Sequence, residues 1–184
     1  MQERAIRTKQ NLLKTGRRLF SEYGLNGVSV DKITKKANVN KQRLYEYFGN
    51  KKQFFEACLI DVFNDIGKEE ANLKILDEKD LKDMTKIILK HYLNCHKNKP
   101  EFWRLIAWAN LTSDFSFKFL KNIKESTFNN IRLLYHKGQK QGVFKKEVSF
   151  EVYIFNLLAV SFFYYSNTKT LKNSLSDNLF SEDG

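Results

Sequence analysis

The chain has 184 residues, of which 42% are hydrophobic, and a formal net charge of +11. This length suffices to bury one good core or two smaller ones. One proline, eight glycines and apolar residues at helical spacing argue against a turn-rich β architecture and predict an all-α chain. Cys58 and Cys95 lack CxxC spacing and no signal peptide precedes them, so we expect no disulfide framework and a reducing, cytoplasmic setting.

The positive charge is unevenly distributed. Residues 1–52 hold 13 Lys and Arg against 4 Asp and Glu, a net +9, which leaves +2 for residues 53–184. A charge gathered in less than a third of the chain is typical of a polyanion-binding module joined to a near-neutral body.

The first predicted helix spans residues 5–23, where apolar residues recur every three or four positions. Gly24 follows it as a left-handed cap. A glycine inside a helix costs about 1 kcal/mol relative to alanine. Gly16 therefore predicts that another helix crosses closely at this point.

Two short capped helices come next. Ser29 is placed to cap the first, with Val28 and Ile33 closing over the cap as a hydrophobic staple. Asn40 caps the second. The turn between them begins at Asn38, a residue that tolerates the left-handed conformation. This arrangement predicts a helix-turn-helix.

Leu44 and Phe48, at i and i+4, predict the buried edge of the second short helix. Its outward side chains have the chemistry of DNA readers, because Arg and Lys donate to guanine, Gln pairs with adenine, and tyrosine hydroxyls donate to phosphates. These residues are Lys41, Gln42, Arg43, Tyr45 and Tyr47. The plainer alternative is a solvated face on a helical hairpin.

Four motifs between residues 7 and 55 keep a fixed spacing. They are Arg7, LFSEYG from Leu19 to Gly24, VSVDKI from Val28 to Ile33, and LYEYFGNKKQFF from Leu44 to Phe55. Together they resemble the DNA-binding domain of the TetR family of bacterial transcriptional regulators, and are far more specific than a single motif. Gly16, Asn38, Gln42 and Arg43 depart from the family pattern, so the resemblance implies the fold but not the operator sequence.

Carried over position by position, the resemblance implies two roles. Lys41, Gln42 and Arg43 are the base-edge readers. The phosphate contacts are Ser29, Tyr45, Tyr47 and Lys51. Lys51 follows Asn50, a candidate N-cap, so its amine and the first N–H groups of the next helix could grip one phosphate together.

Apolar spacing in the body predicts further helices, separated after the first by a polar connection at residues 77–80. They span residues 50–66, 81–96, 101–111, 115–140 and 149–165. The helix from residue 50 would link the two parts mechanically. The longest near-apolar run, residues 152–165, is 14 residues and falls short of the roughly 20 that a bilayer-spanning helix needs. We predict a buried helix there.

The segments HYLNCHKNKPEFWRLIAWANLTSDF and SFFYYSNTKTL resemble the regulatory domain of a TetR subgroup that includes a pyrimidine-utilisation repressor. This weaker resemblance implies an inducer pocket. Its candidate residues are Trp103, Arg104, Trp108, Asn110 and Phe163. Ala109 replaces a Glu common in the subgroup. Members usually have another helix after the region equivalent to Leu179, whereas this sequence stops at Gly184, so we expect either a truncated chain or a smaller dimer. The residues alone leave open a packed aromatic core and, for Arg104, a surface salt bridge.

The sequence gives little support for a metal site, a redox switch or an enzyme. His91 and Cys95 share a helix face, but His96 lies about 100° away, so we expect no metal site. Cys58 is most simply a core residue rather than a redox switch. The sequence shows no nucleophile–base pair, glycine-rich phosphate loop or carboxylate pair at an informative spacing, so we expect neither an enzyme nor a cofactor.

The sequence therefore predicts a TetR-like repressor that a small-molecule inducer releases from a palindromic double-stranded DNA operator. Residues 1–49 would bind DNA, and residues 50–184 would bind the ligand and form a homodimer, mainly through the helix at 149–165. The alternative is a basic helical scaffold or membrane-surface protein without sequence-specific DNA binding, whose affinity for any polyanion would fall with added salt.

Overall fold

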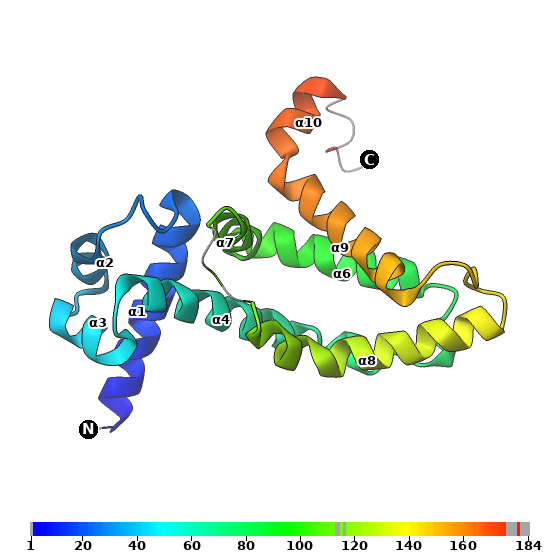
Figure 1. Cartoon of the computed structure of the whole chain (residues 1–184), viewed down its shortest axis with the longest axis horizontal. Coiled ribbons are helices and arrows are strands. Elements are labelled where there is room, and N and C mark those ends of the chain that lie inside the picture. Colours follow the sequence, from blue (N-terminus) through cyan, green and yellow to red (C-terminus); the bar gives the residue numbers. More distant parts are fainter. Residues whose placement is uncertain (1, 113–114, 116, 176–179, 181–184) are drawn as a thin grey trace. The chain divides into compact units, whose positions relative to one another are not determined.

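The computed structural model describes residues 2–112, 115, 117–175 and 180 (Figure 1). The regular elements of these residues are all helical, which confirms the predicted all-α class. In chain order they are α1 (Gln2–Tyr23), α2 (Val30–Ala37), α3 (Lys41–Phe48), α4 (Lys51–Glu69), α5 (Ala71–Lys74), the 3-10 helix η1 (Glu78–Asp80), α6 (Met84–Asn98), α7 (Pro100–Asn110), α8 (Phe119–Lys140), α9 (Phe150–Ser166) and α10 (Thr168–Ser174).

The long helices lie within a few residues of their predicted positions. The largest shift is at the start of α8, which begins at Phe119 rather than residue 115. The starts of α1 and α6 and the end of α4 each differ by three residues from the predicted bounds. The sequence analysis did not predict α5, η1 or α10. These elements have only 4, 3 and 7 residues, too few for an apolar repeat to emerge.

The chain forms two compact units. The first combines residues 1–69 with 100–125, and so contains α1 to α4, α7 and the first turns of α8. The second combines residues 70–99 with 126–184, and contains α5, η1, α6, the rest of α8, α9 and α10. Among the described residues, no helix is both long and apolar enough to cross a membrane.

In the first unit, α1 packs against α2, α4 and α7. Gly16 lies where α4 crosses α1, because a Cβ atom at this position would be 2.5 Å from the Phe54 ring and 2.7 Å from the Cys58 sulfur. The close crossing predicted at Gly16 is thus confirmed. Cys58 is fully buried there, and burial raises the pKa of its thiol well above the usual value, so the unreactive, protonated form is favoured.

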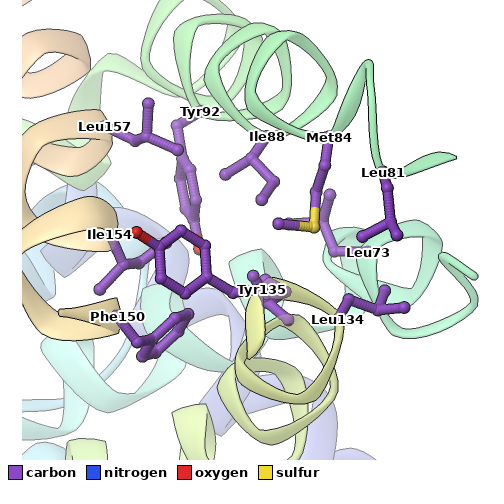
Figure 2. Close-up of a cluster of buried hydrophobic side chains, with 11 residues drawn as sticks. Leu73, Leu81, Met84, Ile88, Tyr92, Leu134, Tyr135, Phe150, Ile154 and Leu157 are labelled. Carbon is purple, nitrogen blue, oxygen red and sulfur yellow. The ribbon is translucent and has the colours of Figure 1, made fainter. Parts of the chain in front are cut away.

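In the second unit, one cluster of buried side chains joins α6, α8 and α9 (Figure 2). Tyr135 of α8 lies within it, stacked on Phe144 and Tyr153 with ring centroids 4.8 and 4.5 Å apart. Its hydroxyl donates to the Val148 carbonyl oxygen at 3.0 Å, so the polar end of the ring is satisfied. The buried members are Leu73, Leu81, Met84, Ile88, Tyr92, Ile131, Leu134, Tyr135, Phe150, Ile154 and Leu157.

The prediction that the near-apolar run of α9 is buried was wrong for half of the helix. One face is buried through Ile154, Leu157 and Ser161. The opposite face is apolar but open. Its exposed residues are Val152, Phe155, Val160 and Phe163, at 51%, 66%, 55% and 54% of full exposure. The second unit supplies core partners to one side of α9 only, although the sequence is apolar on both sides.

Candidate DNA-binding surface

The helix-turn-helix forms from local signals. The Ser29 hydroxyl accepts the Lys32 backbone N–H at 3.1 Å, and the Asn40 side chain accepts the Gln42 N–H at 2.9 Å. Asn38 ends α2 with φ 50° and ψ 48°, the predicted left-handed conformation. These three polar residues set the start of α2, the turn and the start of α3, as the sequence predicts.

Leu44 and Phe48 anchor α3. Leu44 is fully buried, and the Phe48 ring lies 4.7 Å from the Phe54 ring of α4, measured between centroids. Because these two residues face inward, the other side of α3 must face outward. Exposed there are Lys41, Gln42, Arg43 and Tyr45, while Tyr47 is half-buried.

The outward side chains are held by carboxylates from their own unit. Lys41 Nζ lies 2.9 Å from Asp31 Oδ1, a hydrogen bond that raises the pKa of Lys41. Glu46 contacts two of these side chains, since Gln42 Nε2 donates to its Oε1 at 3.1 Å and Arg43 Nη1 lies 3.1 Å from its Oε2. All these pairs are solvent-exposed and therefore weak, so DNA can replace them at little cost.

Two reciprocal hydrogen bonds between Asn50 and Gln53 cap the start of α4. Asn50 Oδ1 accepts the Gln53 N–H at 3.0 Å, and Gln53 Oε1 accepts the Asn50 N–H at 3.1 Å. The sequence analysis expected the cap but missed the reciprocal role of Gln53. Lys51 is half-buried beside this cap, and desolvation lowers the pKa of its amine. An anion at this position would offset that cost.

Sequence reasoning also overlooked the N-terminal turns of α1. A hollow of about 610 Å³ lies next to α3. Its lining residues are Arg4, Ala5, Thr8, Asn38, Val39, Asn40, Arg43 and Tyr47. The usable signal was the pair of arginines at Arg4 and Arg7, three residues apart at the start of the first helix.

The candidate ligand residues fall into two groups. Trp103, Arg104, Trp108 and Asn110 all lie on α7 in the first unit, whereas Phe163 lies on the exposed face of α9 in the second. The Arg104 guanidinium carbon is 5.2 Å from the Trp103 ring centroid, so the expected cation beside a tryptophan is present.

Two of the α7 residues make contacts that the sequence did not reveal. The Trp108 ring packs on Gly24, where an added Cβ would lie 2.8 Å from the ring and where φ is +69°. This contact joins α7 to the turn that follows α1. The Asn110 amide donates to the Ile106 carbonyl oxygen at 3.0 Å, within its own helix. Arg104 lines a cleft of about 770 Å³ along α1.

His91 and Cys95 do share a face of α6, with Nε2 and Sγ 3.5 Å apart. His96 is buried, and desolvation lowers its pKa to about 4, so it is neutral at pH 7. Within the described part of the chain, no three His, Cys, Asp or Glu side chains are grouped to hold a metal ion.

Comparison with known proteins agrees with this geometry. The HTH-type transcriptional repressor NicS of Pseudomonas putida is 27% identical over 184 residues, covering 96% of this chain and 84% of NicS. The transposon Tn10 TetC protein of Escherichia coli is 46% identical over 57 residues, which cover 31% of this chain and 29% of that protein. The crystal structure of the TetR-family regulator HI0893 from Haemophilus influenzae has a TM-score of 0.70 at 22% identity, over 97% of this chain and 92% of that chain.

Two family models match separate parts of the chain. The model for bacterial regulatory proteins of the tetR family matches residues 12–58. The model for the tetracyclin repressor-like C-terminal domain matches residues 82–184, more than half of the chain. The resemblance seen in the sequence motifs is thereby confirmed. The chain therefore belongs to the TetR family of bacterial regulatory proteins, a family of DNA-binding transcriptional regulators and not of enzymes.

Proposed function

We propose that this regulator is a cytoplasmic repressor that binds a two-fold symmetric operator as a homodimer and leaves it when a small molecule binds. The observation that carries this proposal is α3, whose buried Leu44 and Phe48 turn Lys41, Gln42, Arg43 and Tyr45 outward. A capped helix that presents such side chains fits the major groove. The name of NicS, a transcriptional repressor, supports repression over activation.

The proposal assigns DNA binding to residues 1–49 and assigns ligand binding and dimerisation to residues 50–184. Dimerisation rests on the open apolar face of α9, since an exposed apolar face of this kind is typical of a surface that pairs with another protein. Two-fold pairing of identical chains is the commonest outcome and presents two recognition helices to one duplex.

The test is selection of binding sites from fragmented genomic DNA by the purified full chain. We expect recovery of one inverted-repeat sequence, bound at least about a thousandfold more tightly than random duplex. Recovery of unrelated sequences with equal, strongly salt-dependent affinity would instead favour the basic scaffold that the sequence left open.

Within this site, replacement of Arg43 and replacement of Lys51 should change DNA binding in different ways. Arg43→Ala should cost about 1 to 3 kcal/mol on the operator and relax preference at one base pair per half-site, because Arg43 is assigned to a base edge. Lys51→Ala should weaken operator and random duplex alike, and reduce the salt slope by about one per subunit. The measurement is affinity for operator, single-base variants and random duplex across a salt series.

Tyr45→Phe provides the matched comparison, since it removes a hydroxyl assigned to a phosphate without removing charge. It should resemble Lys51→Ala with a smaller change in salt slope. The roles are reversed if Arg43→Ala weakens all duplexes equally or if Lys51→Ala alters base preference. If neither variant changes binding, α3 is not the recognition helix.

The inducer is proposed to bind near Trp103, Arg104, Trp108 and Asn110 of α7, and to carry a planar or aromatic group that can stack on indole. Trp103→Ala should weaken binding of compounds that release the operator, and should leave operator affinity without compound unchanged. Trp103→Phe retains an aromatic ring and should keep most of the response. Trp108→Ala is a poorer probe, because it also removes the ring packed on Gly24. If screening finds only compounds that bind Trp103→Ala and Trp108→Ala as tightly as they bind the parent protein, the proposed location of the inducer site is wrong.

A further inference from the structure

The surface beside the recognition helix continues onto the N-terminal turns of α1. The hollow next to α3 shares Arg4, Thr8, Asn38 and Val39 with a second hollow of about 620 Å³. The second hollow adds side chains from further along α1, namely Arg7, Gln10, Asn11 and Lys14. The two hollows therefore form adjoining parts of one groove, which we call the α1 groove. Its walls are α1, the turn of the helix-turn-helix, and α3.

The α1 groove is basic throughout. Its charged lining residues are Arg4, Arg7, Lys14 and Arg43, and among the described residues no Asp or Glu lines either hollow. Glu3 is exposed on α1 but lies outside both linings. Glu46, the partner of Arg43 on α3, also lies outside them. Four cations around a surface groove without a carboxylate lining match a polyanion, and Thr8, Asn38 and Asn40 add neutral hydrogen-bonding groups suited to phosphate oxygens.

Arg4 and Arg7 do not stabilise α1, the helix to which they belong. Arg4 and Arg7 are both exposed, and Arg4 lies in the first turn of α1, where the helix dipole disfavours a cation. They are also three residues apart on one face, at which spacing like charges repel. Both effects are small, and both would be reversed by an anion bound between the two side chains.

The spacing of the arginines suits a DNA strand. Arg4 and Arg7 are about 4.5 Å apart along the helix axis, and each strand of duplex DNA carries one phosphate per roughly 3.4 Å of its axis. The two guanidinium groups can therefore hold one phosphate or two consecutive ones. Arg43 and Tyr47 are residues of α3 that also line the α1 groove. A DNA strand whose bases contact α3 would therefore have its phosphate backbone next to α1.

We propose that Arg4 and Arg7 bind the phosphodiester backbone of the operator, as a second contact element beside α3. This inference rests on the proposed function and extends it, since the sequence motifs assign no DNA contact to either residue. The contact fixes how α3 is oriented in the groove and carries no base preference. The side chains of the α1 groove would then act with α3 as one surface.

The test uses the full-length double variant Arg4→Ala/Arg7→Ala and the operator recovered by selection. Affinity should fall at least tenfold at about 0.1 M salt, and the salt slope should fall by about 0.9 for each arginine lost, or nearly 4 for a dimer. Preference among single-base operator variants should not change. The control is Lys140→Ala/Lys146→Ala, which removes two exposed lysines from the second unit and should leave operator affinity unchanged.

Operators with a single methylphosphonate locate the contact, because this group removes one phosphate charge at a chosen position. In the parent protein, one or two consecutive positions on one strand of each half-site should weaken binding, and in the double variant the same positions should have no further effect. Arg4→Lys/Arg7→Lys keeps both charges and should retain most of the salt slope. It also serves as the second variant if the alanine pair lowers the thermal midpoint.

Three outcomes would overturn the inference. The double variant could bind like the parent at every salt concentration. It could lose affinity while every methylphosphonate position keeps its parental effect. It could change base preference, in which case the arginines read bases and not phosphates. A parent protein that selects no operator would instead refute the proposed function itself, and this inference with it.

Discussion

Arg17→Ala is expected to lower the free energy of unfolding by about 3 kcal/mol, because it removes the cation from a partly buried cluster of ion pairs. Arg17 of α1 lies in a cluster of charged side chains that joins three helices of the first unit. One of its carboxylate partners, Asp65, also pairs with Lys68. Its Nη1 lies 2.9 Å from Asp61 and 2.6 Å from Asp65, both on α4, and its Nη2 lies 2.9 Å from Glu101 on α7.

The size of the effect follows from burial. The Arg17 side chain is 12% exposed and its three carboxylate partners are 29% to 34% exposed. Removing the guanidinium leaves three partly buried negative charges facing one another, whereas removing one member of an exposed pair costs about 1 kcal/mol at most. The partial exposure of the carboxylates keeps the expected loss at the lower end of the range for buried pairs.

Arg18→Ala is the matched control, because Arg18 is the next residue of α1 and is exposed. It should change the free energy of unfolding by no more than about 0.5 kcal/mol. Arg17→Lys should be intermediate, since one ammonium cannot reproduce the two-armed contact of the guanidinium. Asp61→Asn in the Arg17→Ala background should recover part of the loss. Urea unfolding at pH 7 measures all four variants.

Acid should reduce the difference between Arg17→Ala and the parent. Burial alone acts to raise the pKa of Asp65, but hydrogen bonds from Arg17 and Lys68 lower it overall from 3.8. A lowered pKa in the folded state contributes stability above the unfolded pKa, and this stability is lost as the pH falls through the folded pKa. The difference between parent and variant should therefore shrink below about pH 4. A difference that is under 1 kcal/mol at pH 7, or that grows in acid, would show that the cluster contributes little.

Phe155→Glu is expected to convert the proposed homodimer to a monomer and to weaken operator binding about a hundredfold or more. Phe155 is 66% exposed on the open face of α9, so a charge there costs the single chain little but cannot be buried against a second copy. Without the dimer, the two half-sites are no longer bound by one linked unit, and the gain from linkage is about a hundredfold or more.

Sedimentation at micromolar concentration gives the assembly state, and titration of operator and isolated half-site gives the affinities. Asn94→Glu adds the same charge at an exposed position of α6 in the same unit and should leave both properties unchanged. The half-site affinity of Phe155→Glu should equal that of the parent. A variant that still sediments as a dimer would place the interface elsewhere, and a parent that is monomeric would refute the dimer.

The local structure of the DNA-binding surface could be predicted from the sequence because its causes are local. Ser29, Asn38 and Asn40 each act on backbone groups within a few residues, and the i, i+4 pair of Leu44 and Phe48 decides which side of α3 faces outward. The same holds for the all-α class and for the long helices. The assigned roles of the exposed side chains remain predictions.

The tertiary structure decided the features that depend on partners far away in the chain. Arg17 meets Glu101 across 84 positions, Trp108 packs on Gly24, and α1 forms a groove with α3, none of which follows from spacing along one helix. The open face of α9 is the clearest case, because its sequence is equally apolar on both sides. Only the packing of the second unit shows which side is buried, since burial depends on which surfaces the fold brings into contact.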